Sequence, residues 1–271
     1  MIQLSEINIY PIKSCKGLSL TSSEIDERGL KYDRRWMLLS ADGRPLSQRR
    51  FPNMSMIHVD LLEDKLLVSH DNKRINPLKI PFDNNTTESI EFEIWKRQTR
   101  GNFVSKEADS WFSEVLETDC RLLYMPDEVV MKTNPRFSKG KQTSFTDGYP
   151  FLLIGGASLE DLNARLEKPL SMDRFRPSLI FSGGEAYDED HWKTFRINSI
   201  DFHGVKLCDR CTVTTVDQDN GIKGKEPLAT LNKYRRINMG VYFGQNVVHD
   251  EKGVVSTGDE ITVVERGEPV V

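Results

Sequence analysis

Cysteine is scarce in this chain, and long apolar runs are missing from it. The 271 residues include four cysteines, too few and too scattered for the disulfide framework of a secreted protein of this size. No segment approaches the roughly 18 consecutive apolar residues of a membrane-spanning helix. Residues 1–10 carry charge and polarity where a signal peptide would be apolar. We therefore expect a reduced cytoplasmic protein without a membrane partner.

A surplus of positive charge is also lacking. The formal net charge of −4 argues against general binding to nucleic acid, although it leaves room for a local basic pocket. Hydrophobic residues make up 38% of the chain and charged residues 29%, a balance typical of a folded globular protein. A chain of this length supports one large core or two modest domains.

Short strand patterns separated by turns dominate the sequence, and helical patterns are few. Alternating or β-branched runs predict strands at residues 4–10, 36–40, 57–62, 65–70, 90–94, 121–125, 178–181, 197–205, 245–249, 254–256 and 261–265. Apolar stripes at helical spacing predict helices at residues 107–116, 158–166 and 227–234, the second with Ser158 as its N-cap. The expected fold class is mostly β with a few helices (α+β), arranged as a barrel or sandwich.

The least regular stretch runs from residue 127 to residue 150. It combines Pro135, Gly140 and Gly148 with many polar residues, which disfavours long strands or helices there. We place a domain boundary just before this stretch. The boundary divides the chain into residues 1–122 and residues 123–271.

Cys208 and Cys211 form a Cys-x-x-Cys pair whose use the residues alone leave open. A thioredoxin-like redox pair should begin a helix, yet residues 212–216 favour a strand. A zinc site needs further ligands, and His203 is the candidate nearby in the sequence. Cys211 could instead bind a soft metal by itself, with Cys208 in a minor role. Both thiols could equally be buried as small apolar groups.

Cationic residues stand at the ends of several predicted elements. Lys13 and Ser14 follow the first strand in a short loop suited to an anion. Residues 33–36 are expected to be extended, so Arg34 and Arg35 would point to opposite faces. An arginine that points inward needs an anion or a carboxylate, and Asp33 could provide one without any ligand.

Two further arginines repeat this theme. Arg174 and Arg176 would share one face of an extended segment, either as a basic surface strand or as part of a pocket. Together with Lys13, Arg34 and Arg210, these cations would suit a buried cofactor that carries phosphate.

A set of motifs also occurs in a fixed order along the whole chain. They are Ile9-Tyr-Pro-Ile-Lys-Ser-Cys-Lys-Gly17, Asp33-Arg34-Arg35-Trp36, Arg174-Phe-Arg-Pro177, Arg210-Cys211-Thr-x-Thr-x-Val-Asp217, Lys225-Glu-Pro-Leu228, Phe243-Gly244-Gln245 and Gly258-Asp259. This ordered set resembles the motifs of MOSC-domain proteins with an N-terminal MOSC β-barrel, the family of amidoxime-reducing components and YcbX-like proteins. The resemblance implies an N-terminal β-barrel-like domain and a C-terminal MOSC β-barrel that share one cofactor cleft.

The resemblance implies a molybdenum cofactor, a molybdopterin whose metal is ligated by one protein cysteine. Carried over by position, that metal ligand and catalytic residue is Cys211. Asp217 is a second catalytic candidate, which either organises its loop or handles a proton, and Ser178 stands where relatives often have asparagine. The positions that match cofactor-binding groups are Lys13, Ser14, Arg34, Arg176, Ser178, Arg210 and Cys211. Pyridoxal phosphate is not expected.

The reaction that the resemblance implies is the two-electron reduction of N-hydroxylated compounds: amidoximes, hydroxylamines or N-hydroxylated bases. No cysteine follows Cys211, so we expect electrons from a separate donor protein of the ferredoxin, flavin or cytochrome type. The alternative is a sulfur carrier, or a protein that binds and delivers molybdenum cofactor, which would use Cys211 without catalytic turnover.

Overall fold

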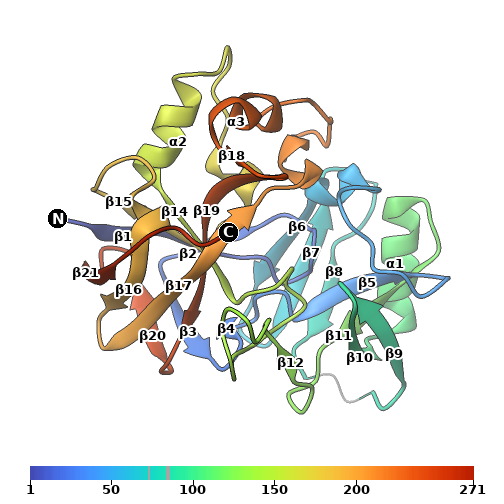
Figure 1. The fold of residues 1–271 in the computed structure, drawn as a ribbon. Helices are drawn as coiled ribbons and strands as arrows, with labels where there is room; N and C mark the ends of the chain where they lie inside the picture. Colours follow the sequence, from blue (N-terminus) through green and yellow to red (C-terminus); the bar gives the residue numbers. More distant parts are fainter. Residues whose placement is uncertain (73, 84–85) are drawn as a thin grey trace.

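Strands dominate the computed structural model, which describes residues 1–72, 74–83 and 86–271 (Figure 1). The largest sheet has the order β2 (Leu18–Leu20), β1 (Gln3–Ile9), β15 (Leu179–Ser182), β14 (Phe151–Gly155), β19 (Gly240–His249), β17 (Ile200–Asp209), β16 (Trp192–Ile197) and β21 (Ile261–Arg266), and β18 (Arg236–Ile237) pairs with β19. The predicted class, mostly β with a few helices, is confirmed.

Smaller sheets and short helices surround the largest sheet. A four-stranded sheet has the order β5 (Trp36–Ser40), β11 (Cys120–Tyr124), β10 (Arg97–Phe103) and β9 (Ser89–Ile94). Two three-stranded sheets have the orders β20 (Gly253–Ser256), β3 (Ser22–Asp26), β4 (Gly29–Leu30) and β6 (Ile57–Leu61), β7 (Lys65–His70), β8 (Leu78–Pro81). A two-stranded pair joins β12 (Met131–Lys132) and β13 (Gln142–Thr143). The 3-10 helices are η1 (Pro52–Met56), η2 (Met172–Phe175), η3 (Asp188–His191) and η4 (Thr212–Thr215).

Two large apolar cores stabilise these sheets. One core lies beneath helix α1 (Lys106–Leu116) and includes Trp36 and Phe112, both at most 1% exposed. The other core lies against the largest sheet and includes Phe151 and Trp192, also at most 1% exposed. Burial of such aromatic side chains is the main favourable contribution to folding.

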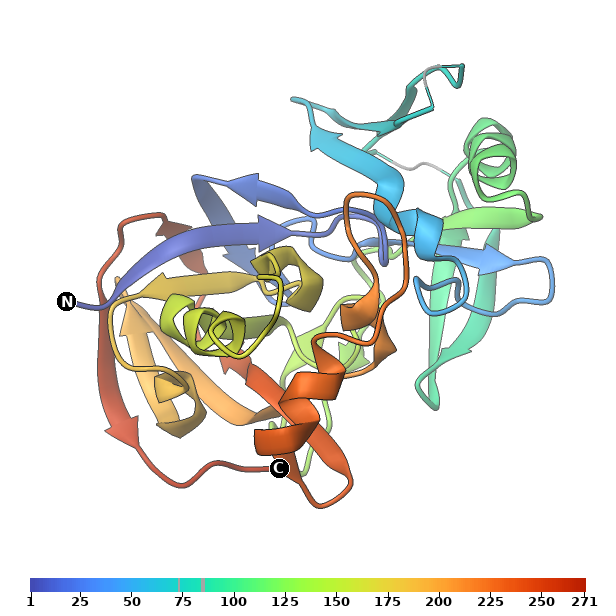
Figure 2. The same ribbon diagram turned by 90° about the horizontal axis from the view of Figure 1, so that it is seen from above.

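The first strands of the chain belong with the last ones in space. Ile7 of β1 pairs with Leu179 of β15 in antiparallel register, so β1 joins a sheet built mainly from residues 151–266. Figures 1 and 2 show these first strands in blue beside strands from the second half of the chain. The division after residue 122 stays a prediction.

The helices lie close to where the apolar stripes predicted them. Ser105 caps α1 by accepting a hydrogen bond from the Ala108 N–H at 3.0 Å, as an N-cap residue should. Helix α3 (Leu228–Tyr234) begins directly after Pro227. Helix α2 (Gly156–Asn163) begins two residues before Ser158, so the prediction of Ser158 as its N-cap is wrong. The Ser158 hydroxyl is instead buried against the Glu189 carboxylate.

The strand predicted at residues 212–216 is wrong, because η4 occupies most of this segment. The Thr214 hydroxyl donates to the Cys211 carbonyl at 3.0 Å, and the Thr215 hydroxyl donates to the Thr212 carbonyl at 2.8 Å. Local bonds of this kind offer the backbone an alternative to strand pairing, and here they outweigh the β propensity of the residues. The strand in this region is β17, which contains Cys208 and ends two residues before Cys211.

Candidate functional site

A cavity of about 880 Å³ gathers residues from distant parts of the chain. Its wall comes from the loop after β1, the turn before β5, the β9–β10 hairpin, the segment 132–152, the loop between η2 and β15, and the end of β17. A volume of this size is typical of pockets for small molecules or cofactors. Among the lining residues are all seven predicted cofactor-binding positions: Lys13, Ser14, Arg34, Arg176, Ser178, Arg210 and Cys211.

The lining is strongly cationic although the chain as a whole is acidic. Its positively charged members are Lys13, Arg34, Arg49, Arg97, Lys132, Arg176, Lys206 and Arg210, against the carboxylates of Asp147 and Asp209. Lys13 forms an ion pair with Asp147, and Arg34 forms one with Asp33. The other six form no ion pair with any residue that the structure describes. Such an excess of positive charge suits an anionic ligand.

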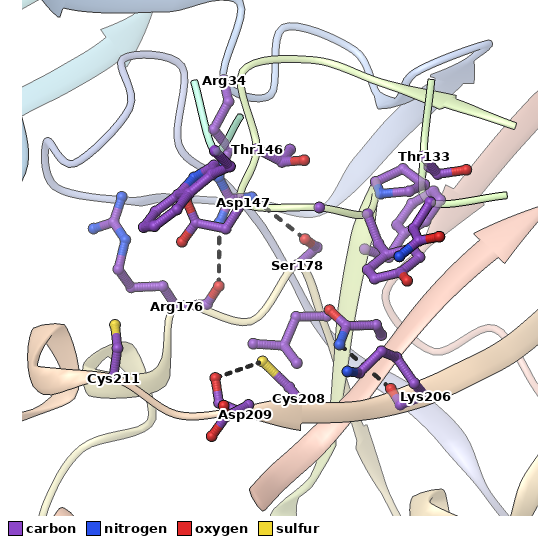
Figure 3. Close-up of a pocket in the computed structure, with 18 of the residues that line it drawn as sticks. Arg34, Thr133, Thr146, Asp147, Arg176, Ser178, Lys206, Cys208, Asp209 and Cys211 are labelled. Atoms are coloured by element: carbon purple, nitrogen blue, oxygen red, sulfur yellow. Dashed lines mark hydrogen bonds between the residues drawn. The ribbon is translucent and has the colours of Figure 1, made fainter. Parts of the chain in front are cut away.

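Arg34 and Arg176 lie against the same buried aromatic ring. The guanidinium carbon of each is 4.1 Å from the centroid of Tyr10, which is 2% exposed. Arg34 donates to Asp33 at 2.5 Å. It also donates to the Ser178 hydroxyl at 3.5 Å and to the Arg176 carbonyl at 3.3 Å (Figure 3). Arg176 donates to a backbone carbonyl, that of Cys15, at 2.7 Å.

These bonds leave the two guanidiniums short of negative charge. Burial, together with the charge of Arg34, lowers the pKa of Arg176 to about 10, although Tyr10 opposes the shift. Burial also raises the pKa of Asp33 above its ordinary value, and the neighbouring Arg34 counteracts that effect. Arg34 and Arg176 can therefore bind an anion together, and no strong ion pair at Arg176 has to break first.

The backbone at these arginines corrects the prediction of extended segments. The backbone at Arg34 and at Arg176 has a left-handed conformation, with φ values of 48° and 56°. Arg34 lies in a turn before β5, and Arg176 follows η2. Arg34 and Arg35 still diverge, but Arg174 and Arg176 do not share a face, because Arg174 pairs with Asp217 outside the cavity.

Lys13 is held by two acceptors at the cavity wall. Its ammonium donates to the Phe145 carbonyl at 2.8 Å and to Asp147 Oδ1 at 2.5 Å. Burial lowers the pKa of Lys13, and the charge of Asp147 opposes that shift. Burial alone would raise the pKa of Asp147, but Lys13 and Arg49 hold it well below its ordinary value. Asp147 is therefore ionised at neutral pH.

Both thiols line the cavity, but their surroundings differ. Arg210 Nη1 donates to Cys208 Sγ at 3.0 Å, and Arg210 Nη2 donates to the Phe175 carbonyl at 2.7 Å. Burial raises the pKa of Cys208, and Arg210 counteracts the shift. Cys211 lies at the start of η4, and Figure 3 shows its sulfur on the same side of the cavity as Arg176. Cys211 is therefore free of the arginine bond that engages Cys208.

The two predicted serines line the cavity from different loops. Ser14 has a left-handed backbone with φ of 68°, and its carbonyl accepts a hydrogen bond from Gln48 at 2.9 Å. Ser178 is 1% exposed and receives the weak bond from Arg34. Both serines line the same cavity as the predicted cations.

Asp217 is absent from the described residues that line the cavity. Its Oδ2 accepts from Arg174 at 2.7 Å, and its Oδ1 accepts from the backbone N–H of Asp219 at 3.0 Å. These bonds fix the turn after η4, the kind of local bond that aspartate side chains commonly form. The catalytic role of Asp217 stays a prediction.

Sequence reasoning missed several lining residues. No predicted motif contains Arg49, Lys132 or Lys206, and Trp95 and Arg97 follow the predicted strand at residues 90–94 without any predicted role. A signal was available in the segment 127–150, whose irregular composition is typical of loops that carry function. Lining residues of that segment include Thr133, Asn134, Phe137, Asp147 and Tyr149.

The family follows from a comparison of domains. Residues 1–119 match the MOSC N-terminal beta barrel domain, and residues 140–262 match the MOSC domain. The chain therefore belongs to the family of MOSC-domain proteins that carry an N-terminal MOSC β-barrel. The cavity draws its lining from both matched regions and from the segment between them.

Named relatives fall into two groups. The chain is 32% identical to mitochondrial amidoxime-reducing component 1 of Mus musculus, over 95% of this chain and 81% of the relative. It is also 32% identical to mitochondrial amidoxime reducing component 2 of Homo sapiens, over 86% of this chain and 72% of the relative. A molybdenum cofactor sulfurase of Oryza sativa subsp. japonica is 30% identical over 98% of this chain, which spans 34% of that longer protein.

Proposed function

We propose that the chain is a molybdenum-cofactor-dependent oxidoreductase that reduces N-hydroxylated compounds by two electrons. One observation carries the proposal: a single cation-rich cavity contains the seven positions expected to bind the cofactor, including the thiol of Cys211. The names of the amidoxime-reducing relatives support the reaction class.

The donor set fits a phosphorylated pterin that carries a soft metal. Six cavity cations have no carboxylate partner in the described chain, and a phosphate group would supply the missing negative charge. Arg210 Nε is buried without a hydrogen-bond acceptor among the described residues. A thiolate is the ligand type that a soft metal prefers, and Cys211 would supply it.

The proposed roles follow from the contacts. Lys13, Arg34 and Arg176 would neutralise the anionic part of the cofactor, with the hydroxyls of Ser14 and Ser178 as further donors. Arg210, whose guanidinium bonds to the Cys208 sulfur and to the Phe175 carbonyl, would add a further positive charge beside Cys211.

The overall reaction is balanced by two electrons and two protons. An N-hydroxyl group, two electrons and two protons give an amine or amidine and one water molecule. When bound, the cofactor would supply the two-electron redox chemistry. The chain itself would bind the substrate, exclude bulk water from the cavity and deliver protons. A separate protein of the ferredoxin, flavin or cytochrome type would supply the electrons.

A cytoplasmic location is part of the same proposal. In the portions of the chain that the structure describes, no helix combines the length and the apolarity needed to cross a bilayer.

The direct test combines metal analysis with a reduction assay. Protein made in cofactor-competent cells should contain about one molybdenum atom per chain, as ligation by a single cysteine requires. It should then reduce a model amidoxime when an artificial electron donor is present. Protein that carries the metal but reduces no N-hydroxylated compound would refute the proposed reaction.

A second candidate function is favoured by two observations. A molybdenum cofactor sulfurase is among the relatives, and a second thiol, Cys208, lines the same cavity. The chain would then carry sulfur on Cys211 or deliver the cofactor without turnover. Mass spectrometry that finds a persulfide on Cys211 in metal-free protein would favour this candidate over the reductase.

A further inference from the structure

Trp95 differs from the other tryptophans in its exposure. It is 47% exposed, whereas Trp36, Trp111 and Trp192 are 1%, 9% and 0% exposed. The side chain of Trp95 lines the cavity. A large aromatic ring left open in a concave site is typical of a surface that meets a ligand.

The backbone that carries this ring has an unusual conformation. Trp95 and Lys96 link β9 to β10, and the residues that flank them, Ile94 and Arg97, are paired across the hairpin. Both linking residues have positive φ values, 53° and 62°. Two-residue hairpin loops of this kind usually carry asparagine and glycine, because larger side chains crowd the backbone there. Strained positions of this sort cluster at ligand-binding and active sites.

Two contacts orient the ring at the cavity wall. Trp95 Nε1 donates to Asp147 Oδ1 at 3.1 Å, the same oxygen that accepts from Lys13 at 2.5 Å. The guanidinium carbon of Arg49 lies 4.6 Å from a ring centroid of Trp95. The N–H edge of the indole is therefore fixed, yet nearly half of the side chain remains exposed.

The hairpin itself is tied to the rest of the cavity. Arg97 Nη2 donates to the Thr146 carbonyl at 3.3 Å, and Arg97 Nη1 donates to the Lys132 carbonyl at 3.4 Å. A ring held in place before the ligand arrives loses little freedom on binding, which favours affinity.

We propose that Trp95 is a stacking platform that selects planar, conjugated N-hydroxylated substrates over saturated ones. The proposal rests on the proposed function, because it names the substrate class of the same cavity. Aryl amidoximes and N-hydroxylated bases present flat π systems that stack on an indole, whereas a saturated ring does not. Asp147 bonds to both Trp95 and Lys13, so the platform adjoins the proposed cofactor-binding group.

Calorimetric titration with two matched amidoximes tests the platform. Benzamidoxime and cyclohexanecarboxamidoxime share the reacting group and differ in the planarity of the ring. The full-length chain should bind the aromatic compound about tenfold more tightly. Trp95→Ala should bind the two compounds equally, and Trp95→Phe should keep most of the preference.

Three controls separate stacking from a structural role. Lys96→Ala changes the same turn and should keep the preference. Trp95→Ala should match the parent chain in melting temperature and molybdenum content. A preference that survives in Trp95→Ala would overturn the proposal, and so would a loss of cofactor from that variant, because the ring would then be a cofactor contact.

Fluorescence gives a readout that needs no turnover. Because Trp95 is much more exposed than the other three tryptophans, collisional quenching by acrylamide reports mainly on this ring. Benzamidoxime should protect the ring from quenching, and cyclohexanecarboxamidoxime should protect it far less. Equal protection by both compounds would overturn the platform.

The outcomes for the platform and for the enzyme are distinct. A chain that binds benzamidoxime preferentially but reduces neither compound would refute the proposed reaction and leave the platform in place. Reduction of both compounds with the same kcat/KM ratio in the parent chain and in Trp95→Ala would overturn the platform alone.

Discussion

The segment before β5 and the segment before β15 use nearby arginines in the same two ways. In each segment one arginine, Arg34 or Arg176, has a left-handed backbone and lies 4.1 Å from the ring of Tyr10 in the cavity. The other, Arg35 or Arg174, does not line the cavity and pairs with an aspartate of a distant segment, Asp127 or Asp217.

The difference between the two kinds of arginine comes from backbone direction and available acceptors. Arg35 donates to the Met125 carbonyl and to Asp127, both at 2.6 Å, and Arg174 donates to Asp217 at 2.7 Å. Among the residues that the structure describes, Arg176 has one acceptor, the Cys15 carbonyl. Arg34 and Arg176 line the cavity, where their guanidiniums can reach a ligand, whereas Arg35 and Arg174 do not line it and bond to the surrounding fold.

The two cysteines show the same contrast between a proposed ligand and a side chain bonded to the fold. Their substitution should have the largest effect, which is on molybdenum content. Cys211→Ala should reduce molybdenum content from about one atom per chain to less than about a tenth of that, because the proposed ligand is removed. Cys208→Ala should keep most of the metal, because its sulfur already accepts a bond from Arg210. Elemental analysis of both variants checks this. Equal losses would mean a two-thiol site.

A buried carboxyl that does not line the cavity sharpens the comparison, because burial shifts its pKa where no ligand is proposed to bind. Glu189 is 0% exposed and accepts from the Gly155 N–H at 3.1 Å and from Ser158 at 2.8 Å. Burial, with a contribution from Asp190, raises its pKa from 4.5 to about 7. Its stabilising contribution is therefore complete below pH 4.5 and is lost as the pH rises through 7.

Glu189→Gln should flatten this pH dependence of stability. The shift corresponds to about 3 kcal/mol of unfolding free energy lost across that range. Denaturant unfolding at a series of pH values measures it, and the exposed neighbour variant Glu185→Gln is the control. An unchanged slope in Glu189→Gln would show that other groups cause the dependence.

Substitutions of Arg35 and Arg34 should have different effects, one on the stability of the fold and the other on ligand binding. Arg35→Ala should lower the free energy of unfolding by about 2 kcal/mol, because it leaves the buried Met125 carbonyl without its donor. Arg34→Ala should instead weaken cofactor retention. Chemical unfolding and metal analysis measure the two effects, and Arg44→Ala, at a side chain 74% exposed, serves as the control for stability. Unchanged cofactor retention in Arg34→Ala would remove that arginine from the site.

Arg176 and Arg174 give the smallest expected difference. Arg176→Ala should weaken cofactor retention about tenfold through the loss of a charge-assisted contact. Arg174→Ala should change retention less than about twofold, because its guanidinium is engaged with Asp217 outside the cavity. Dialysis followed by metal analysis compares the two variants. Similar losses of cofactor from both variants would show that Arg176 and Arg174 do not differ in their role at the cavity.

Much of the fold was predictable because it depends on local patterns. The strand at Trp36–Ser40 and the strand at Lys65–His70 have the predicted bounds, since each is a short apolar run bounded by turns. The prediction failed at residues 212–216, where threonine hydroxyls bond back to the chain. It also failed at Ser158, whose hydroxyl is used by Glu189, a partner 31 residues away in sequence.

The candidate site was predictable only in part. The motifs around Lys13, Arg34, Arg176 and Cys211 named residues that line one cavity. The contributions of Trp95 and Arg49 were not predictable, because each stands in a local pattern that is common on protein surfaces. Their meeting at 4.6 Å depends on how the β9–β10 hairpin packs against the segment before η1.

The amino-acid sequence by itself determined the strand-rich class, the family motifs and the residue types able to hold an anion and a soft metal. Spacing along the chain carries that information, because strands, turns and motifs are local. Only the tertiary structure decided which cations remain unpaired, which thiol is engaged by arginine, and which tryptophan faces the cavity. Those outcomes depend on burial and on partners that are distant in sequence, and both arise only when the sheets come together.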